Sequence, residues 1–578
     1  MMISLAVAGA VWAQESAEAA PDTVGVFTDV TDVRVANLEV FVTDRSGEPI
    51  VGLTQDEFEL HLDGERVPIT NFYAEVGGEA REAVAAIDRP AGDDGFMPLE
   101  AVAADPARRA HVLLLIDHTR IGAVRRQQAF KALRSAVAEL DDDDLVAVAG
   151  IEGSVVFYSD FLFDRAAIGD VLDDVSEVSL TLGRADVERR QILGELQRGL
   201  SGGLVARSTL AEEGPLLNRI QAYAAEEYDR GLRSLRQIQT VASTLGGIPG
   251  RKALIYVSEG IPTRPGEGLF VEWRNRFGGG NPEAAIGMRR FDFNKDYIRS
   301  VGNYDLTRAV DQAALAANQA GVTLYGIDAD ARQGLALRSV ETEQGATSEA
   351  VSVVAENFRA PLESVTQQTG GRLLRASGRL SEQLGSLMND FDTYYSLGFK
   401  PPADWQPGSD HRVEVKVDRR RARVRYREAL RVERQNEREA GATVAALLYN
   451  TVDNPLGISA TLGSEAPRDD GTAALPVQLA IPVGELTLVP KGGTSNLSLS
   501  IYISIQDAEG NPGPVQAIPF HLAIPQDKVE AAKGDAAHYT LPLVLRPGDR
   551  RVAISVRDDV SRKMSTVRLD VAQYSDLI

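Results

Sequence analysis

Two short segments of the chain place oxygen-bearing side chains directly after apolar runs. The segment 117–122 reads Asp-His-Thr-Arg-Ile-Gly, and the segment 258–260 reads Ser-Glu-Gly. Carboxylate and hydroxyl oxygens are the ligands that hard divalent cations such as magnesium prefer. If the two segments meet in the fold, Asp117, Thr119 and Glu259 form a candidate metal site. Mg²⁺ or Mn²⁺ would then be the cofactor.

Whether the segments meet depends on the elements that carry them. The apolar run at 111–116 is typical of a central parallel strand that is buried on both faces. Similar runs at 145–149, 253–257 and 322–327 alternate with segments of helical spacing. This alternation predicts an α/β fold with a doubly wound, mostly parallel sheet, similar to a Rossmann sheet. Ligands of such sheets bind at the carboxyl ends of the strands, so we expect the two segments to converge there.

The strand Leu-Leu-Leu-Ile followed by Asp-x-Thr, with a later strand ending in carboxylate-Gly, resembles the von Willebrand factor A domain. The resemblance implies a metal-ion-dependent adhesion site with Asp117 and Thr119 as ligands, a second-loop threonine at Thr181, and Glu259 where aspartate is usual. Ile121 stands where the family has a hydroxyl. We therefore expect a degenerate site that binds Mg²⁺ or Mn²⁺ weakly or not at all. In the alternative, Asp117 and Thr119 only cap the following helix.

Further motifs are similar to those of the VWFA-related acidobacterial domain family, over a match that spans Val33 to Arg427. This resemblance implies export and an A-type fold. The motifs are Val-Thr-Asp-Arg-Ser-Gly-Glu-Pro at 42–49, Leu-Thr-Gln-Asp-Glu-Phe at 53–58, Asp-Gly at 63–64, Gly-Arg-Lys at 250–252, Thr-Gly-Gly-Arg at 369–372 and Tyr-Tyr-Ser-Leu-Gly-Phe at 394–399.

Changes of pattern along the chain divide it into modules. Period-two alternation predicts a β-rich module at the N-terminus, and short strands with turn motifs predict a β-sandwich at the C-terminus. The predicted segments are an export signal at 1–13, the β-rich module at 30–76, a linker at 77–109, the A-like domain with a late β-extension at 110–430, a charged linker at 431–440 and the β-sandwich at 441–578.

Composition narrows the classes of partner. The 578 residues carry a formal net charge of −22, which disfavours nucleic acid and anionic lipid as partners. Cysteine is absent, so no disulfide or thiolate chemistry is available. The uncharged apolar run from Ile3 to Trp12, followed by Ala13, resembles an export signal. We expect a periplasmic, cell-surface or extracellular protein without stable membrane insertion, because no later run reaches the ~18 apolar residues of a membrane span.

Catalytic motifs are missing from the sequence. It has no Gly-x-Ser-x-Gly elbow, no His-Glu-x-x-His pair and no phosphate loop, and of the six histidines only His118 falls at the predicted ligand face. The sequence therefore favours a non-enzymatic, adhesion-type binding protein with a protein or glycan partner. The alternatives are a structural or assembly component of the cell envelope with an inert A fold and, less favoured, an uncharacterised hydrolase that uses His118 or Glu259.

One strand near the end of the A-like domain has a cationic face. Arg421, Arg423, Arg425 and Arg427 alternate with smaller or aromatic residues. Such a face could hold an anionic partner, because guanidinium groups bind carboxylate and phosphate well. A charged face is also typical of a solvated edge strand that resists aggregation, and this is the interpretation we favour.

Overall fold

The computed structural model describes residues 36–571 of the chain, apart from internal gaps. The predicted export signal at 1–13 and most of the predicted linker at 77–109 lie outside the described residues. No helix among the described residues combines the length and the apolarity needed to cross a membrane. The gaps are at 77–78, 83–109, 139, 141–143, 179–182, 199–207, 279–298, 330–347, 376–382, 385–386, 388, 392, 403–404, 407 and 433.

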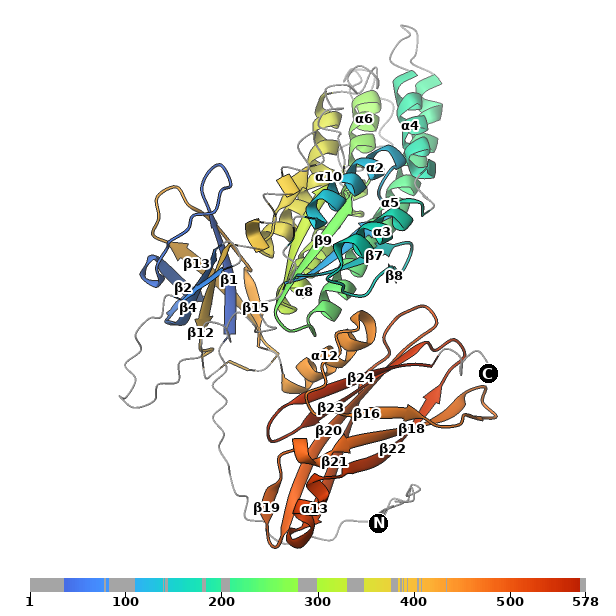
Figure 1. Ribbon diagram of the computed structural model, residues 1–578. Helices are drawn as coiled ribbons and strands as arrows, with labels where there is room; N and C mark the ends of the chain where they lie inside the picture. Colours follow the sequence, from blue (N-terminus) through green and yellow to red (C-terminus); the bar gives the residue numbers. More distant parts are fainter. Residues whose placement is uncertain are drawn as a thin grey trace, which may run out of the picture.

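The first unit consists of two β-sheets that combine N-terminal strands with strands that follow the α/β region in the sequence (Figure 1). One sheet has the order β14-β1-β12-β4-β5 and the other β15-β13-β2-β3. Phe58, Phe72 and Tyr395 pack in their shared core, with ring centroids 5.2 to 5.8 Å apart. The strands are β1 (Ala36–Thr43), β2 (Phe58–Leu62), β3 (Glu65–Val67), β4 (Ile69–Val76), β5 (Glu79–Glu82), β12 (Tyr394–Phe399), β13 (Asp410–Val417), β14 (Arg423–Tyr426) and β15 (Ala429–Arg431), with a 3-10 turn η1 (Gln55–Glu57).

This pairing differs from the predicted domain boundaries. The sequence predicts a separate module at 30–76 and places the strands after 391 in a late extension of the A-like domain. In the structure β1 pairs antiparallel with both β12 and β14, so the two segments form one unit and the α/β unit is inserted between β5 and β12. Alternation predicts a strand, but its partner is chosen by packing between segments that are distant in sequence.

The inserted α/β unit contains the predicted mostly parallel sheet. Its order is β11-β10-β9-β6-β7-β8, in which only β8 is antiparallel to its neighbour. Counted in chain order within the sheet, this is the doubly wound arrangement 3-2-1-4-5-6 read from β8. The strands are β6 (Ala110–Asp117), β7 (Leu145–Ile151), β8 (Val155–Phe157), β9 (Arg251–Ser258), β10 (Val322–Asp328) and β11 (Leu373–Arg375).

Helices cover both faces of this sheet, which is why β6 is buried along its whole length. Val112 and Leu114 face a hydrophobic cluster that includes Phe130, and Leu113 faces a second cluster that includes Leu235. The helices of the unit are α2 (Ala123–Val137), α3 (Arg165–Ser176), α4 (Gly183–Arg198), α5 (Ser208–Leu245), α6 (Glu267–Gly278), α8 (Thr307–Gln319) and α10 (Ser348–Gln368).

Helix α5 is unusually long and serves two cores. It has 38 residues, which corresponds to about 57 Å of α-helix. Its C-terminal half packs on the sheet through Leu235 and Leu245. Its N-terminal half packs with α4 and α6 around Ile220 and Trp273, in a core of its own. We call α4, α6 and this half of α5 the helical lobe, and Figure 1 shows it beyond the carboxyl ends of the strands.

The third unit consists of two antiparallel sheets around a common apolar core. It is joined to the rest by α12 (Gln435–Tyr449), whereas the sequence predicted a linker at 431–440. The first turn of α12 is charged, but later residues of the helix contact both neighbouring units. Tyr449 packs in the α/β core, and the Thr443 hydroxyl donates a hydrogen bond to Ser555 of the third unit at 2.9 Å. The other elements are β16 (Ser459–Leu462), β17 (Ala466–Pro467), β18 (Ala473–Pro482), η4 (Val483–Glu485), β19 (Val489–Lys491), β20 (Thr494–Gln506), β21 (Gln516–Pro525), η5 (Gln526–Lys528), α13 (Val529–Lys533), β22 (Ala536–Leu545), β23 (Arg551–Asp558) and β24 (Met564–Asp570).

Candidate functional site

The two predicted loops meet at the carboxyl edge of the parallel sheet. Strand β6 pairs with β7 on one side and with β9 on the other, so the loop after β6 leaves at the topological switch point. Two hydrogen bonds join the loops. The Glu259 amide donates to the Arg120 carbonyl at 2.8 Å, and the Gly122 amide donates to Glu259 Oε1 at 2.7 Å. We call Asp117, Thr119, Arg120 and Glu259, with the side chains that bind them, the rim site.

Asp117 ends β6 and is fully buried. Its Oδ1 accepts hydrogen bonds from the Thr119 amide at 3.0 Å and the Thr119 hydroxyl at 2.6 Å. Its Oδ2 accepts from the hydroxyls of Ser234 and Tyr256, each at 2.7 Å. Burial and the nearby Asp117 charge raise the pKa of Tyr256 well above its usual value, so this phenol remains a donor. Both carboxylate oxygens are therefore bound by groups of the chain itself.

A buried cation stands beside this carboxylate. Arg120 is 4% exposed, and its Nε donates to the Ser234 hydroxyl at 3.1 Å. Its guanidinium also lies 3.7 Å from Glu227 Oε2, and Glu227 forms a second ion pair with Arg230 at 2.6 Å. The hydroxyl of Ser234 thus links the charges of Asp117 and Arg120. The charges of this network are paired, although the buried Arg120 Nη2 has no hydrogen-bond partner among the described residues.

Ile121 and Glu259 complete the rim. Ile121 is fully buried in the apolar cluster of one sheet face, so its side chain supplies no oxygen where the family has a third hydroxyl. Glu259 lies at the N-terminus of α2, where a carboxylate is favoured by the helix dipole. Asp117 does not cap that helix, because its Oδ1 accepts from the Thr119 amide, while the N-cap amide of Gly122 donates to Glu259. The predicted ligand Thr181 lies outside the described residues.

These residues do not fit a divalent cation. Magnesium requires near-octahedral coordination and normally keeps several water molecules. A cation at Asp117 would have to replace donors on both carboxylate oxygens, and it would lie next to Arg120, whose positive charge is only one hydroxyl away. Among the described residues, no group of three or more histidine, aspartate or glutamate side chains lies close enough to hold one metal ion.

Helices α5 and α10 cover the rim site. Ser234 and Glu227 come from α5, and Gly260 packs against the carbonyl of Phe358 in α10, where a Cβ would approach to 2.6 Å. Asp117 is 0% and Glu259 8% exposed. The carboxylate of a partner therefore has no open path to Asp117 in this arrangement.

His118 is unsuited to act as a general base. It is 1% exposed, and neither ring nitrogen has a hydrogen-bond partner among the described residues. Burial, together with the nearby Arg126 charge, lowers the pKa of His118 to about 4. The Thr119 hydroxyl, the nearest candidate nucleophile in the sequence, is bound to Asp117. Within the described part of the rim, the hydroxyls of Thr119 and Ser234 donate to the buried Asp117 carboxylate and not to a histidine.

Sequence reasoning missed the partners of Asp117. Ser234 lies in a run that the sequence predicted only as helix, and Tyr256 lies within a strand predicted only as buried. A hydroxyl-bearing residue near the carboxyl end of a fully buried strand, such as Tyr256, indicates a polar partner nearby, because a buried hydroxyl needs a hydrogen bond. No comparable signal singles out Ser234 among the polar residues of a 38-residue helix.

Comparisons with known proteins identify no family for the chain. No protein-family model matches it, and no curated protein matches it. Among solved structures, BatB from Bacteroides thetaiotaomicron is 11% identical with a TM-score of 0.18, and the match covers 49% of this chain and 98% of that chain. A von Willebrand factor type A structure from Catenulispora acidiphila is 12% identical, TM-score 0.19, covering 80% and 66%. The pilus tip protein Mfa5 from Porphyromonas gingivalis is 9% identical, TM-score 0.24, covering 93% and 76%. Scores this low carry no argument about function.

Proposed function

We propose that the protein is an exported, non-enzymatic binding protein whose α/β unit works without a metal ion. The observation that carries the proposal is the closed network around Asp117. At the place where doubly wound sheets bind ligands, the chain supplies its own cation, Arg120, and its own hydroxyls, those of Ser234 and Tyr256. An internal cation and internal donors make a bound metal unnecessary for the stability of this rim.

The resemblance to the von Willebrand factor A domain supports a role in binding. The Asp-x-Thr motif at 117–119 ends the strand next to the switch point, and the sheet order is the doubly wound one. The motifs shared with the VWFA-related acidobacterial domain family, together with the apolar run after Ile3, support export to the periplasm, the cell surface or the medium. These features favour a protein or glycan partner at the cell envelope.

Because the rim is covered, the partner meets the outside of the α/β unit. The helical lobe is suited to this contact, because α5 connects it directly to the rim network and to the sheet. In this account the Asp117 network positions the lobe, and the partner does not touch Asp117. The alternative of an inert assembly component is favoured by α12, which packs two units against each other. A hydrolase is disfavoured by the burial and low pKa of His118.

Partner capture with and without a chelator tests the proposal. The full chain is immobilised and exposed to a solubilised envelope fraction, in magnesium or in EDTA, and retained molecules are identified after cross-linking. We expect the same partner in both conditions. Asp117→Asn is compared with Asp527→Asn, an exposed aspartate in η5 that serves as the control. A partner that is lost in EDTA and lost in the Asp117 variant, but kept by the control, would show a working metal site and overturn the proposal.

A further inference from the structure

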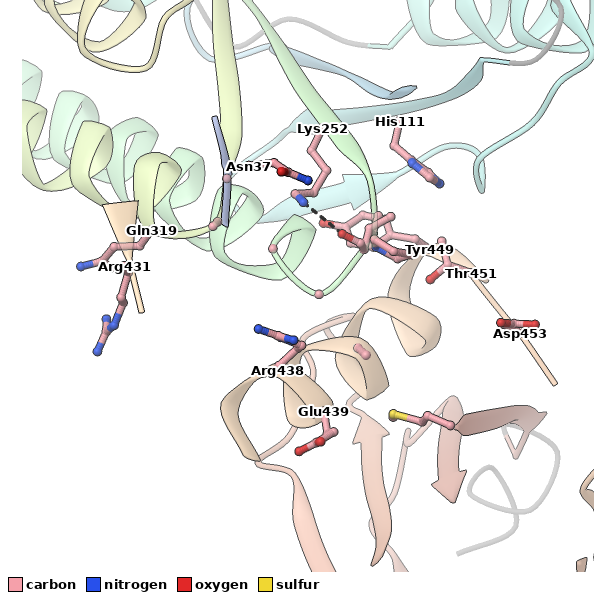
Figure 2. Close-up of a pocket in the computed structure, with 18 of the residues that line it drawn as sticks. Asn37, His111, Lys252, Gln319, Arg431, Arg438, Glu439, Tyr449, Thr451 and Asp453 are labelled. Atoms are coloured by element: carbon pink, nitrogen blue, oxygen red, sulfur yellow. Dashed lines mark hydrogen bonds between the residues drawn. The ribbon is translucent and has the colours of Figure 1, made fainter. Parts of the chain in front are cut away.

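A large cleft lies at the opposite end of the parallel sheet from the rim site. Its volume is about 1000 Å³. The α/β unit contributes His111 and Lys252 from the amino ends of β6 and β9, the first β unit contributes Asn37, and α12 contributes Tyr449 (Figure 2). The third unit completes the wall with Arg557. Clefts of this size at the junction of several units are common ligand sites.

The units around the cleft are in close contact, so the cleft has fixed walls. A Cβ on Gly247 would lie 2.0 Å from the Gly441 carbonyl, which shows how closely α12 approaches the turn after α5. The Tyr449 hydroxyl lies 2.6 Å from the Thr244 hydroxyl, and the Tyr449 ring contacts the Phe157 ring with centroids 5.2 Å apart. The wall formed by α12 is thus held to the α/β unit by backbone contact and by a buried aromatic side chain.

The cleft is cationic in a strongly acidic protein. Two carboxylates, Glu439 and Asp453, line it. The chain as a whole has a net charge of −22, so a local excess of positive charge is unusual for it. The positive side chains in the lining are Lys252, Arg427, Arg431, Arg438, Arg557 and Arg562.

Several of these cations have evident structural roles. Lys252 donates to the carbonyls of Ile248 and Gly250 at 3.1 and 2.9 Å. Arg557 pairs with Glu439 and also with Asp559, the latter at 2.6 Å. Neither residue is therefore the best anchor for an incoming ligand.

Arg427 is different, and it belongs to the cationic strand face seen in the sequence. The strand is shorter than the sequence predicts: β14 holds the exposed Arg423 and Arg425, which pairs with Asp390 at 2.7 Å, while the exposed Arg421 lies in the turn before it. Arg427 instead faces the cleft. Its bonds go to the carbonyls of Asn37 and Asn318, at 3.1 and 3.5 Å, and among the described residues it has no carboxylate partner.

The surroundings of Arg427 favour an incoming negative charge. Arg427 is half-buried, and burial lowers its pKa, while the charge of the nearby Glu39 offsets part of that change. Gly321 leaves room beside it, because a Cβ there would lie 3.0 Å from Nη1. The bond to Asn318 near the end of α8 explains part of the position as helix capping. A guanidinium has five N–H donors, however, and its two bonds to neutral carbonyls leave donors for an incoming anion, while Glu39 acts on it only through its charge.

We propose that this cleft binds a small anionic ligand bearing carboxylate or phosphate groups, with Arg427 as the anchor. Guanidinium groups bind both kinds of anion through paired, charge-assisted hydrogen bonds. Arg431, whose Nε is buried without a hydrogen-bond partner, adds a second cation to the lining. A ligand held between the walls would bridge three units of the chain. This site is separate from the rim and does not depend on the proposed partner.

Isothermal titration calorimetry on the full chain tests the proposal, with inorganic pyrophosphate and citrate as separate probes at constant ionic strength. We expect saturable binding of at least one probe, weakened at least tenfold in Arg427→Gln. The matched control is Arg423→Gln, which removes an exposed arginine from the adjoining strand β14 and is expected to bind as the wild type does. Preference for pyrophosphate or for citrate identifies the anion class.

Two further variants keep the test decisive if Arg427→Gln folds poorly. Arg427→Lys retains the positive charge and is expected to retain part of the binding, while Arg431→Gln is expected to weaken it without loss of fold. Melting curves establish that each variant is folded. Absence of saturable heat with both probes in the wild type, or equal affinity of wild type and Arg427→Gln, would overturn the proposal. Failure here would leave metal-independent partner capture untouched, because that assay reports on the rim and the lobe.

Discussion

Tyr256→Phe is the most specific perturbation of the rim network. Tyr256 is fully buried, and its hydroxyl donates to Asp117 Oδ2 at 2.7 Å. The substitution removes one oxygen and keeps the shape of the ring, so packing changes little. A hydrogen bond to a charged acceptor contributes about 1.5–3 kcal/mol. Ser234 still donates to the same oxygen, so the carboxylate keeps a partner. We therefore expect a loss of about 2 kcal/mol, within this range.

Thermal unfolding followed by the helical circular dichroism signal measures this loss. Most of the described helices belong to the α/β unit, so the signal reports mainly on that unit. For a unit of this size, 1 kcal/mol shifts the melting temperature by roughly 2–4 °C, and the expected decrease is therefore roughly 4–8 °C. Tyr304→Phe is the control, because the Tyr304 hydroxyl has no hydrogen bond within the described residues, and its removal should cost less than ~0.5 kcal/mol.

The difference in melting temperature between Tyr256→Phe and Tyr304→Phe tests whether the Tyr256 hydroxyl stabilises the rim. If Tyr256→Phe melts at the same temperature as Tyr304→Phe, then the hydroxyl of Tyr256 contributes nothing to the stability of the rim. The network around Asp117 would in that case not be the closed structure described above. An increase in the stability of Tyr256→Phe would point the same way.

Three further predictions follow from the same contacts. The pKa of His118 is about 4 in the folded chain and near 6.5 in the unfolded chain, so the unfolded state binds more protons between pH 4 and pH 6.5. The free energy of unfolding therefore falls as the pH drops through that window, by up to about 1.4 kcal/mol per pH unit. His118→Phe should remove this part of the loss in urea unfolding at several pH values; an unchanged pH profile would refute the assignment. Ile121→Ser should cost roughly 2–4 kcal/mol, because a buried branched side chain is lost, yet calorimetry should still detect no magnesium binding. Gly247→Ala should loosen α12 from the α/β unit and speed proteolysis between them, whereas Gly194→Ala, with open space at its Cβ, should not.

The sequence predicted the central sheet and the meeting of its two loops for a physical reason. Strands buried on both faces require continuous apolar runs, and β6 and β9 show such runs. In a parallel sheet the residues after each run must emerge at one edge, so Asp117 and Glu259 were bound to lie near each other if these strands were neighbours. The pairing of β6 with β9 supplies that condition.

The partners of each segment were beyond the reach of local patterns. The alternation in β1 does not indicate that it pairs with β12, more than 350 residues later in the chain by its register Ala36 to Phe399. Ser234 can donate to Asp117 only because tertiary packing turns that face of α5 toward the sheet. The charged first turn of α12 indicated a linker, but the apolar residues later in that helix pack against two units.

The central claim is that the rim is complete without a metal ion, and calorimetric titration of the chelator-treated chain with magnesium and then manganese tests it most directly. We expect no saturable heat with either cation, and the same melting temperature with excess metal as with EDTA, because a ligand of the folded state would stabilise it. Saturable binding that also raises the melting temperature, and that disappears in Asp117→Ala, would contradict the account.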